Sequence, residues 1–179
     1  MKAWIWTALV ILVAIVAIGS SIALGGLTLI EWYKPVSAGL IGGWIVGMFC
    51  WKISRRATGI ESRAANYVIA SLYAATLLVA AFYTLNFVFD DVDTEHIETV
   101  TVQRKYTKTR HRSERVGRNR YRPGRAYKVY FIEVEFDDGR TKDIEIPLSR
   151  YNRLRSGGTA DLRMSTGLFG VPVIHLREK

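Results

Sequence analysis

The chain has 179 residues, 49% of them hydrophobic, and a formal net charge of +9 at pH 7. The long hydrophobic runs lie before residue 90, whereas the last 90 residues hold 19 Lys and Arg against 14 Asp and Glu. This division excludes one water-soluble core built from the whole chain. It describes a membrane region followed by a basic polar domain, so the charge does not by itself indicate nucleic acid.

Three uncharged runs predict three transmembrane helices. The first, residues 3–30, is about twice as long as the apolar part of a signal peptide, which favours a retained helix over about residues 4–30. The second, residues 35–51, has 17 residues, which is the lower limit for a span and leaves a re-entrant segment open. The third, residues 64–89, has 26 residues and would reach about 39 Å as a helix, against ~30 Å for a hydrocarbon core.

Glycines recur every four residues in the second run, at Gly39, Gly43 and Gly47. Residues four apart share one face of a helix, and small residues there let two helix backbones approach closely. The stripe is therefore predicted to be a helix-packing face. Packing against the first or third helix of the same chain is the favoured interpretation, and a groove that accepts a partner helix is the alternative.

The loop after the second run sets the expected orientation. It holds four basic residues and one acid: Lys52, Arg55, Arg56, Arg63 and Glu61. Cytoplasmic loops are enriched in Lys and Arg, whereas acidic residues dominate the flank from Asp90 to Glu98. The sequence thus predicts a multi-pass protein of the bacterial cytoplasmic (inner) membrane with its N-terminus inside. Residues 1–89 form the transmembrane region, and residues 90–179 form an extracytoplasmic domain.

The second half of the chain has the pattern of a small β domain. Polar and apolar residues alternate in several segments, and Asp138-Gly139 supplies the positive φ angles of a tight turn. Strands are predicted over residues 97–103, 128–136, 141–146, 159–164 and 171–176, with a short helix over 149–154. The predicted fold class is an α+β membrane protein, in which three N-terminal transmembrane helices precede a small antiparallel β domain with a long basic hairpin.

Two short motifs mark this domain: Phe136-Asp137-Asp138-Gly139-Arg140 and Gly157-Gly158-Thr159-Ala160-Asp161-Leu162-Arg163. With the short helix between them, residues 97–176 resemble uncharacterised bacterial membrane proteins that have a small extracytoplasmic β domain. The motifs consist of turn chemistry and strand pattern. The resemblance implies a helix-anchored β domain, and it carries over no activity and no functional residue.

The stretch of residues 104–125 is strongly basic, with eight Arg, two Lys and one His against a single acid, Glu114. It is predicted to be a long hairpin with its tip near residues 116–124. Arg is suited to bidentate contacts with phosphate or carboxylate. The candidate anion- or partner-binding residues are Arg110, Arg112, Arg115, Arg118, Arg120, Arg122 and Arg125. The alternative is a solvated, flexible loop whose charges keep an exposed strand edge from pairing with other chains.

No residue pattern indicates catalysis. His96, His111 and His175 lie far apart without metal-ligand spacing, and the single Cys50 excludes a disulfide within the chain. We therefore expect no enzymatic activity, no catalytic residue, no metal and no cofactor. Charged side chains are absent from the three predicted spans, which argues against a transporter that acts alone.

Two functions are compatible with these features. The first is a non-catalytic accessory or structural subunit of a bacterial inner-membrane complex, whose β domain contacts a partner outside the cytoplasm. The alternative is an envelope binding module that holds an anionic lipid, polymer or acidic protein through the 104–125 hairpin. The expected partners are membrane lipid, a protein partner or a second copy of the chain, and an anionic envelope polymer. Nucleic acid is not expected, because the predicted side of the membrane holds little of it.

Overall fold

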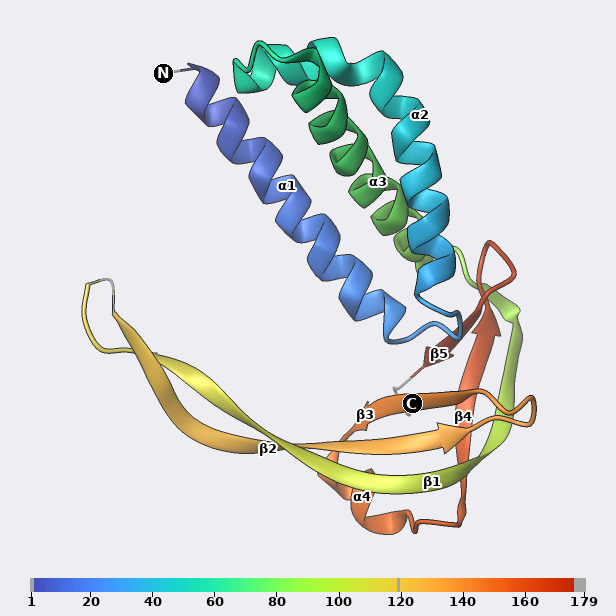
Figure 1. The fold of residues 1–179 in the computed structure, drawn as a ribbon. Coiled ribbons are helices and arrows are strands. Elements are labelled where there is room, and N and C mark those ends of the chain that lie inside the picture. Colours follow the sequence, from blue (N-terminus) through green and yellow to red (C-terminus); the bar gives the residue numbers. More distant parts are fainter. Residues whose placement is uncertain (1, 119, 176–179) are drawn as a thin grey trace. The chain divides into compact units, whose positions relative to one another are not determined.

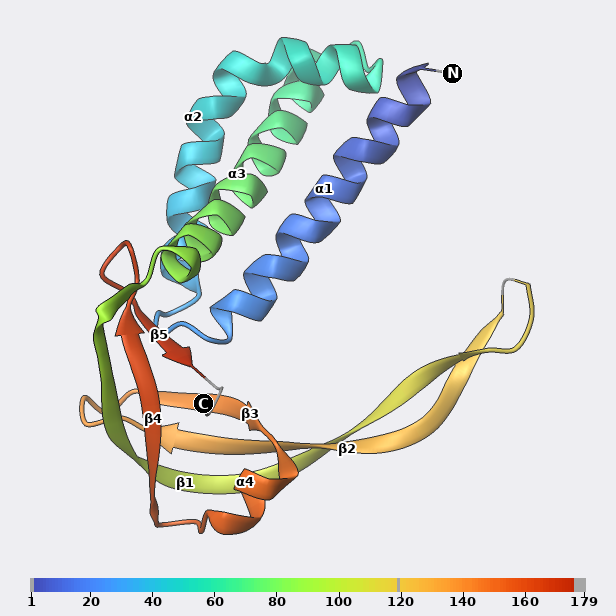
Figure 2. The ribbon, with the colours of Figure 1, turned by 180° about the vertical axis from the view of Figure 1, so that it is seen from behind.

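The computed structural model describes residues 2–118 and 120–175, apart from the side chains of residues 2–4 and 6. Its elements follow one another as α1 (Lys2–Gly25), α2 (Tyr33–Thr58), α3 (Arg63–Val88), β1 (Asp91–Arg115), β2 (Tyr121–Glu135), β3 (Thr141–Ile146), α4 (Leu148–Arg153), β4 (Thr159–Thr166) and β5 (Pro172–His175) (Figures 1 and 2). The five strands form one sheet in the order β3-β2-β1-β4-β5. Three long apolar helices followed by an antiparallel sheet confirm the α+β layout.

The described chain forms two compact units. The first contains residues 1–95 and 165–174, and the second contains residues 96–164 and 175–179. These bounds differ from the division at residues 89 and 90 that the change in composition predicts, because the segment 165–174 joins the helices.

The three helices of the first unit are long and apolar enough to cross a membrane. The predicted bounds of the third helix, residues 64–89, are confirmed to within one residue at each end, since α3 covers Arg63–Val88. The predicted second helix, residues 35–51, is too short, because α2 continues to Thr58 and has 26 residues. The basic residues that end the uncharged run are good helix formers and continue the helix. With 26 residues, α2 is long enough to cross a membrane, so its length no longer favours a re-entrant segment.

The first predicted helix is too long, because α1 ends at Gly25 rather than near residue 30. The chain that follows pairs with β5: Leu29 N–H donates to Pro172 O at 2.9 Å, and Ile174 N–H donates to Leu27 O at 2.7 Å. Thr28 forms the β-bridge to Val173 and is fully buried. Glycine weakens a helix, so the segment after Gly25 exchanges helical hydrogen bonds for sheet pairing.

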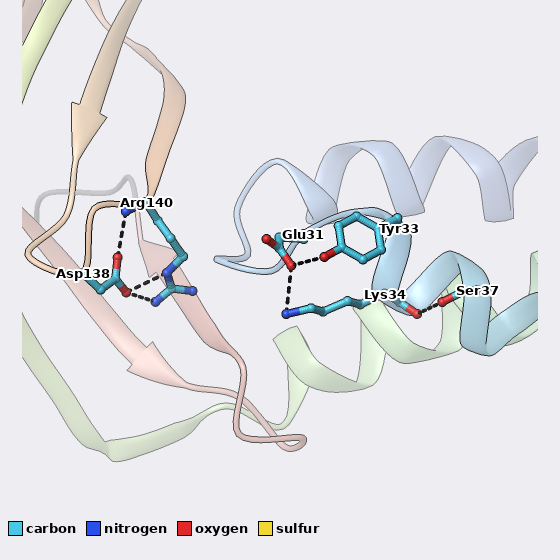
Figure 3. A network of polar contacts seen from close by, with 6 residues as sticks. All are labelled: Glu31, Tyr33, Lys34, Ser37, Asp138 and Arg140. Carbon is cyan, nitrogen blue, oxygen red and sulfur yellow. Dashed lines mark hydrogen bonds and ion pairs between the residues drawn. The ribbon is translucent and has the colours of Figure 1, made fainter.

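A local polar cluster lies at the start of α2 (Figure 3). Glu31 Oε2 accepts the Tyr33 hydroxyl at 2.7 Å and forms an ion pair with Lys34 Nζ at 2.8 Å, and the Ser37 hydroxyl donates to Lys34 O at 3.0 Å. A carboxylate next to a helix N-terminus is favoured by the exposed N–H groups there. At the other end, Gly59 adopts φ +70° and terminates the helix.

The glycine stripe of α2 lies against α3. A Cβ added to Gly39 would meet Ala75 O at 3.2 Å, and one added to Gly43 would meet Ser71 O at 2.5 Å and Ala75 N at 2.6 Å. At Gly47 an added Cβ would overlap the Ser71 side chain. The three glycines therefore pack against α3 of the same chain, and Gly43 lets the two helix backbones approach most closely.

A buried asparagine joins α3 to the turn between β4 and β5. Asn86 is 0% exposed; its Nδ2 donates to Val171 O at 3.1 Å, and its Oδ1 accepts the Phe169 N–H at 3.1 Å. Phe169 also stacks on Phe82, with ring centroids 5.0 Å apart. A side chain at Gly167 would overlap Asn86, so the turn needs glycine there.

The core of the second unit lies on one face of β1, β2, β3 and β4. Val102 pairs with Val134, and Ile132 pairs with Ile144. The most buried of these side chains, each at most 1% exposed, are Val100, Val102, Ile132, Val134, Leu162 and Met164. Each such side chain contributes about 1.5–3 kcal/mol relative to an exposed position, which makes this apolar layer the main stabilising element of the unit.

The turn between β2 and β3 is the predicted one. Gly139 has φ +78°, and Phe136 N–H donates to Arg140 O at 2.9 Å. Asp138 accepts the backbone N–H of Arg140 at 2.9 Å and its Nε at 2.6 Å (Figure 3). These bonds hold the pKa of the Asp138 carboxyl below its usual value. The predicted last strand reaches Leu176, which lies outside the described residues.

The close contact of α2 with α3 makes Gly43→Ala a sharp test. The added methyl would meet backbone atoms of α3, so we expect a loss of about 1–3 kcal/mol in stability, measured by thermal unfolding in detergent micelles. Gly19→Ala in α1 is the matched control, because nothing lies within 4 Å of its added Cβ. Equal melting temperatures for the two variants would contradict this packing.

Candidate functional site

The strands β1 and β2 continue as a two-stranded ribbon beyond the residues of β2 that pair with β3 (Figures 1 and 2). We call residues 108–129 of this hairpin the basic arm. It contains seven Arg, two Lys and a single acid, Glu114. The sequence correctly predicts a long hairpin here, but the strands extend further than expected, since β1 continues to Arg115 and β2 begins at Tyr121.

Backbone pairing keeps the arm regular along its length. The register runs from Lys108 opposite Val129 to Arg115 opposite Tyr121, with one irregularity between His111 and Ser113. Val116 N–H donates to Arg120 O at 2.8 Å and closes the tip. The arm is thus a β-ribbon with defined side-chain positions, since residues opposite one another in an antiparallel pair point to the same face.

Arg115, a predicted anion-binding residue, is engaged inside the tip. Its Nε donates to Gly117 O at 3.0 Å and its Nη2 donates to Arg118 O at 2.7 Å. These bonds satisfy two carbonyls that the turn leaves without strand partners. The structure therefore places Arg115 as a group that shapes the tip.

Aromatic rings hold the cations at the base of the arm. Tyr106 stacks on Phe131 with centroids 5.4 Å apart, and Lys108 Nζ lies 4.9 Å from the Phe131 ring. Arg110 lies 5.9 Å from the same ring, and Arg112 lies 6.0 Å from the Tyr127 ring. Such cation–π contacts contribute about 0.5–1 kcal/mol each at exposed sites, so these side chains are partly ordered before any ligand arrives.

Arg110 also has an acidic neighbour. Its Nη1 lies 3.5 Å from Glu145 Oε2 of β3, and both side chains are about half exposed. An ion pair of this kind is worth little in water. An external anion can therefore replace Glu145 at small cost.

The remaining predicted residues, Arg118, Arg120, Arg122 and Arg125, are all exposed. No side-chain ion pair is recorded for them within residues 2–118 and 120–175. Arg118 and Arg120 lie in the tip, so the alternation that an extended strand would impose on Arg118, Arg120 and Arg122 applies to Arg122 alone. Gly124 leaves room for Glu114, whose Oε1 accepts the Arg125 N–H at 3.4 Å.

Sequence reasoning missed the aromatic supports Tyr106, Tyr127 and Phe131. The sequence did hold a signal for Tyr106. Side chains two positions apart in a strand share one face, so this ring must lie on the same face as Arg104, Lys108 and Arg110. The matching ring on the opposite strand could not be found without the register. No cluster of His, Cys, Asp or Glu in the described part of the chain is arranged to hold a metal ion.

Tyr106 also has an altered ionisation. Burial together with a hydrogen bond to Asp143 raises the pKa of its phenol from 10.0 to about 12. Asp143 lies on β3, opposite Glu133 of β2, and Glu133 forms an ion pair with Arg104 at 3.0 Å. The base of the arm is thus a connected polar and aromatic network on one face of the sheet.

No protein-family model, curated protein or solved structure matches this chain. The resemblance of residues 97–176 to helix-anchored bacterial β domains therefore stays a prediction. The candidate site rests on the chain's own geometry: a basic β-ribbon whose base is braced by aromatic rings and whose outer arginines are exposed.

The raised pKa of Tyr106 predicts a pH-dependent stability. The folded form keeps the proton that the unfolded form loses near pH 10, so the stabilisation is complete below pH 10 and is lost between pH 10 and about 12. Thermal unfolding of Tyr106→Phe should lose less stability over this range than the wild type. In an ultraviolet titration, Asp143→Asn should bring the phenol back towards pH 10. Identical curves for wild type and Tyr106→Phe would refute the assignment.

Proposed function

We propose that this chain is a non-catalytic, membrane-anchored binding module of the bacterial inner membrane, and that its basic arm holds an anionic polymer outside the cytoplasm. One observation carries the proposal: strand pairing continues to Arg115 and Tyr121, so Arg110 and Arg122 project from paired strands rather than from a loose loop. Pre-ordered donors lose less conformational entropy when they bind a ligand.

The form of the arm favours a linear ligand. Its eight residues of β1, from Lys108 to Arg115, extend for about 26 Å at ~3.3 Å per residue. Basic side chains occur along the whole of this length and again in β2, with Tyr121 and Tyr127 exposed between them. A chain of phosphate or carboxylate groups can contact several of these arginines at once, each through a charge-assisted hydrogen bond.

One argument for the accessory-subunit function no longer applies. The glycine stripe of α2 was an argument for a partner helix, but Gly39, Gly43 and Gly47 lie against α3 of the same chain. Membership of a larger complex stays a prediction, and the basic arm is the feature that now favours a function most directly.

The arm test replaces Arg120 and Arg122 together by Gln. Each charge-assisted hydrogen bond is worth about 1.5–3 kcal/mol, so losing two should cost roughly 3 kcal/mol, or about a hundredfold in affinity. The measurement is a binding titration of the full chain in detergent micelles with fluorescent inorganic polyphosphate. Poly-L-glutamate in parallel tells whether phosphate or carboxylate is preferred. Binding should weaken as salt rises, since screening acts on exposed charges.

The matched control removes two charges elsewhere in the same unit. Arg153→Gln with Arg155→Gln changes exposed residues outside the arm, and it should leave the affinity near that of the wild type. If Arg120→Gln with Arg122→Gln binds polyphosphate and polyglutamate as the wild type does at low salt, the arm does not hold an anion and the proposal fails.

The orientation has its own test. In a Cys50→Ser background, a cysteine at Ser113 in the arm should react with an impermeant thiol reagent in intact cells. A cysteine at Glu61, in the exposed basic loop, should not react until the cells are opened. The reverse pattern would place the arm in the cytoplasm and would overturn the proposed location.

A further inference from the structure

A groove of about 630 Å³ lies between α2 and α3 at the ends that the loop 59–62 joins. Its walls are formed by Met48 and Trp51 of α2 and by Arg63, Ala64 and Tyr67 of α3. The groove is open on one side, and its volume lies in the range of small-molecule sites. Because Arg63 belongs to the wall, the groove offers an apolar surface and a positive charge together.

The groove follows one face of α2. Large or basic side chains recur there every three or four residues, at Trp44, Met48, Trp51 and Arg55. Side chains with this spacing lie on one face of a helix. Tyr67 of α3 joins this face, because its hydroxyl donates to Trp44 O at 3.2 Å. The face is thus apolar over two turns and becomes basic at Arg55, towards the loop.

Two cations meet one ring at the loop end of the groove. The Trp51 ring lies 4.7 Å from the guanidinium carbon of Arg63 and 5.8 Å from Lys52 Nζ. Among the residues that the structure describes, neither these two nor Arg55 forms an ion pair. Glu61, the single acid of the loop, is exposed and forms none either. An anion that enters the groove therefore meets several cations that no carboxylate compensates.

The same features give the level of the groove in a membrane. Tryptophan with basic neighbours is typical of the boundary between the hydrocarbon core and the headgroups. From Trp44 to Arg55 the face of α2 extends over eleven residue steps, or roughly 16 Å. One leaflet of a ~30 Å hydrocarbon core is about 15 Å deep. An acyl chain that begins at the basic end can therefore lie along this face through one leaflet.

From this juxtaposition we infer a binding site for an anionic phospholipid, with its phosphate at Arg63, Lys52 and Arg55 and one acyl chain along the apolar part of the groove. The planar guanidinium of Arg63 can donate two hydrogen bonds to a phosphate. Its position over the Trp51 ring orders this donor before the lipid arrives. Basic pockets between membrane helices recognise anionic headgroups in this way. The site rests on the proposed membrane location but requires neither the basic arm nor its ligand, so it stands or fails independently of the arm.

A helix matches this groove less well than a lipid does. Helix interfaces in membranes are rich in small residues that let two backbones approach, whereas Met48, Trp51 and Tyr67 of this wall are large. A second copy of the chain docked through the same face would also bring two sets of like charges together. A phospholipid brings a negative charge to the basic end and a narrow, flexible chain to the apolar part.

The first test measures lipid retention by native mass spectrometry of the full chain, released from vesicles of equal parts phosphatidylglycerol and phosphatidylcholine with the same acyl chains. The wild type should retain phosphatidylglycerol preferentially. Arg63→Gln should lower this preference about fivefold, the equivalent of ~1 kcal/mol. Arg56→Gln is the matched control, because it removes one exposed charge from the same end of α2 outside the groove wall. Equal losses in the two variants, or no preference in the wild type, would overturn the site.

A second pair of variants tests the shape of the groove. Ala64→Trp places an indole inside the wall and should abolish the preference for phosphatidylglycerol. Ala81→Trp places the same side chain at an exposed alanine of the same helix, away from the groove, and should retain phosphatidylglycerol as the wild type does. A wild-type preference in Ala64→Trp would show that the groove does not hold the lipid.

A measurement on the unsubstituted chain guards against misfolded variants. In detergent micelles, phosphatidylglycerol with a photoreactive diazirine in one acyl chain should label Met48, Trp51 and Tyr67 on irradiation, as mapped by mass spectrometry of peptides. Unlabelled phosphatidylglycerol should suppress this labelling several-fold, whereas phosphatidylcholine and inorganic phosphate should not. Labelling spread evenly over the exposed faces of the three helices, or equal suppression by the two lipids, would overturn the site. Suppression by inorganic phosphate would assign the basic end to a free anion and would also overturn it.

Discussion

Backbone N–H and C=O groups that lie outside helices and strands still need hydrogen-bond partners, and this requirement constrains where the chain can turn. Near a membrane it is stricter, because water is scarce there. Three side chains meet it: Asn66 accepts and donates in the turn between α2 and α3, Asn86 holds the turn between β4 and β5, and Arg115 caps the tip of the basic arm. These bonds hold the turn after α2, the end of the sheet and the tip of the arm.

The two basic regions of the chain, the basic arm and the C-terminal end of α2, differ in the secondary structure that carries their charge. In the arm, the arginines stand on an exposed two-stranded ribbon, where salt would screen any attraction to an anion. At the end of α2, Lys52, Arg55 and Arg56 are exposed on one face of the helix, and the apolar residues Val46, Cys50 and Ile53 lie on the other. The arm carries nine basic residues against one acid, whereas the end of α2 and its loop carry four basic residues against one acid, so the larger positive charge stands on the ribbon.

Local sequence signals predicted the elements that local physics controls. The bounds of α3, the Asp138-Gly139 turn and the existence of the basic hairpin follow from uncharged length, turn chemistry and alternation. The ends of α1 and α2 could not be predicted in the same way. A sheet partner distant in sequence takes the backbone after Gly25, and basic helix formers carry α2 past the uncharged run.

The sequence predicted the charged residues of the candidate site, but it did not predict the aromatic and hydrogen-bond contacts that hold them. The arginines are visible in the sequence, but the stacking of Tyr106 on Phe131 depends on a register between residues 25 positions apart, shown by their pairing. The same holds for Arg115, whose acceptors exist only once the tip has formed. Contacts that depend on long-range register are set by the whole sheet, which no local pattern specifies.

The bridge between Thr28 and Val173 imposes an order on biosynthesis. The two residues are 145 positions apart (173 minus 28), so the segment after α1 emerges from the ribosome long before its strand partner exists. The backbone groups of residues 27–29 that pair with β5 therefore stay without these partners until β5 has been made. The first unit is thus closed by residues made about 145 positions after the segment that they pair with, so a chain that stops before them would leave this segment without its strand partner.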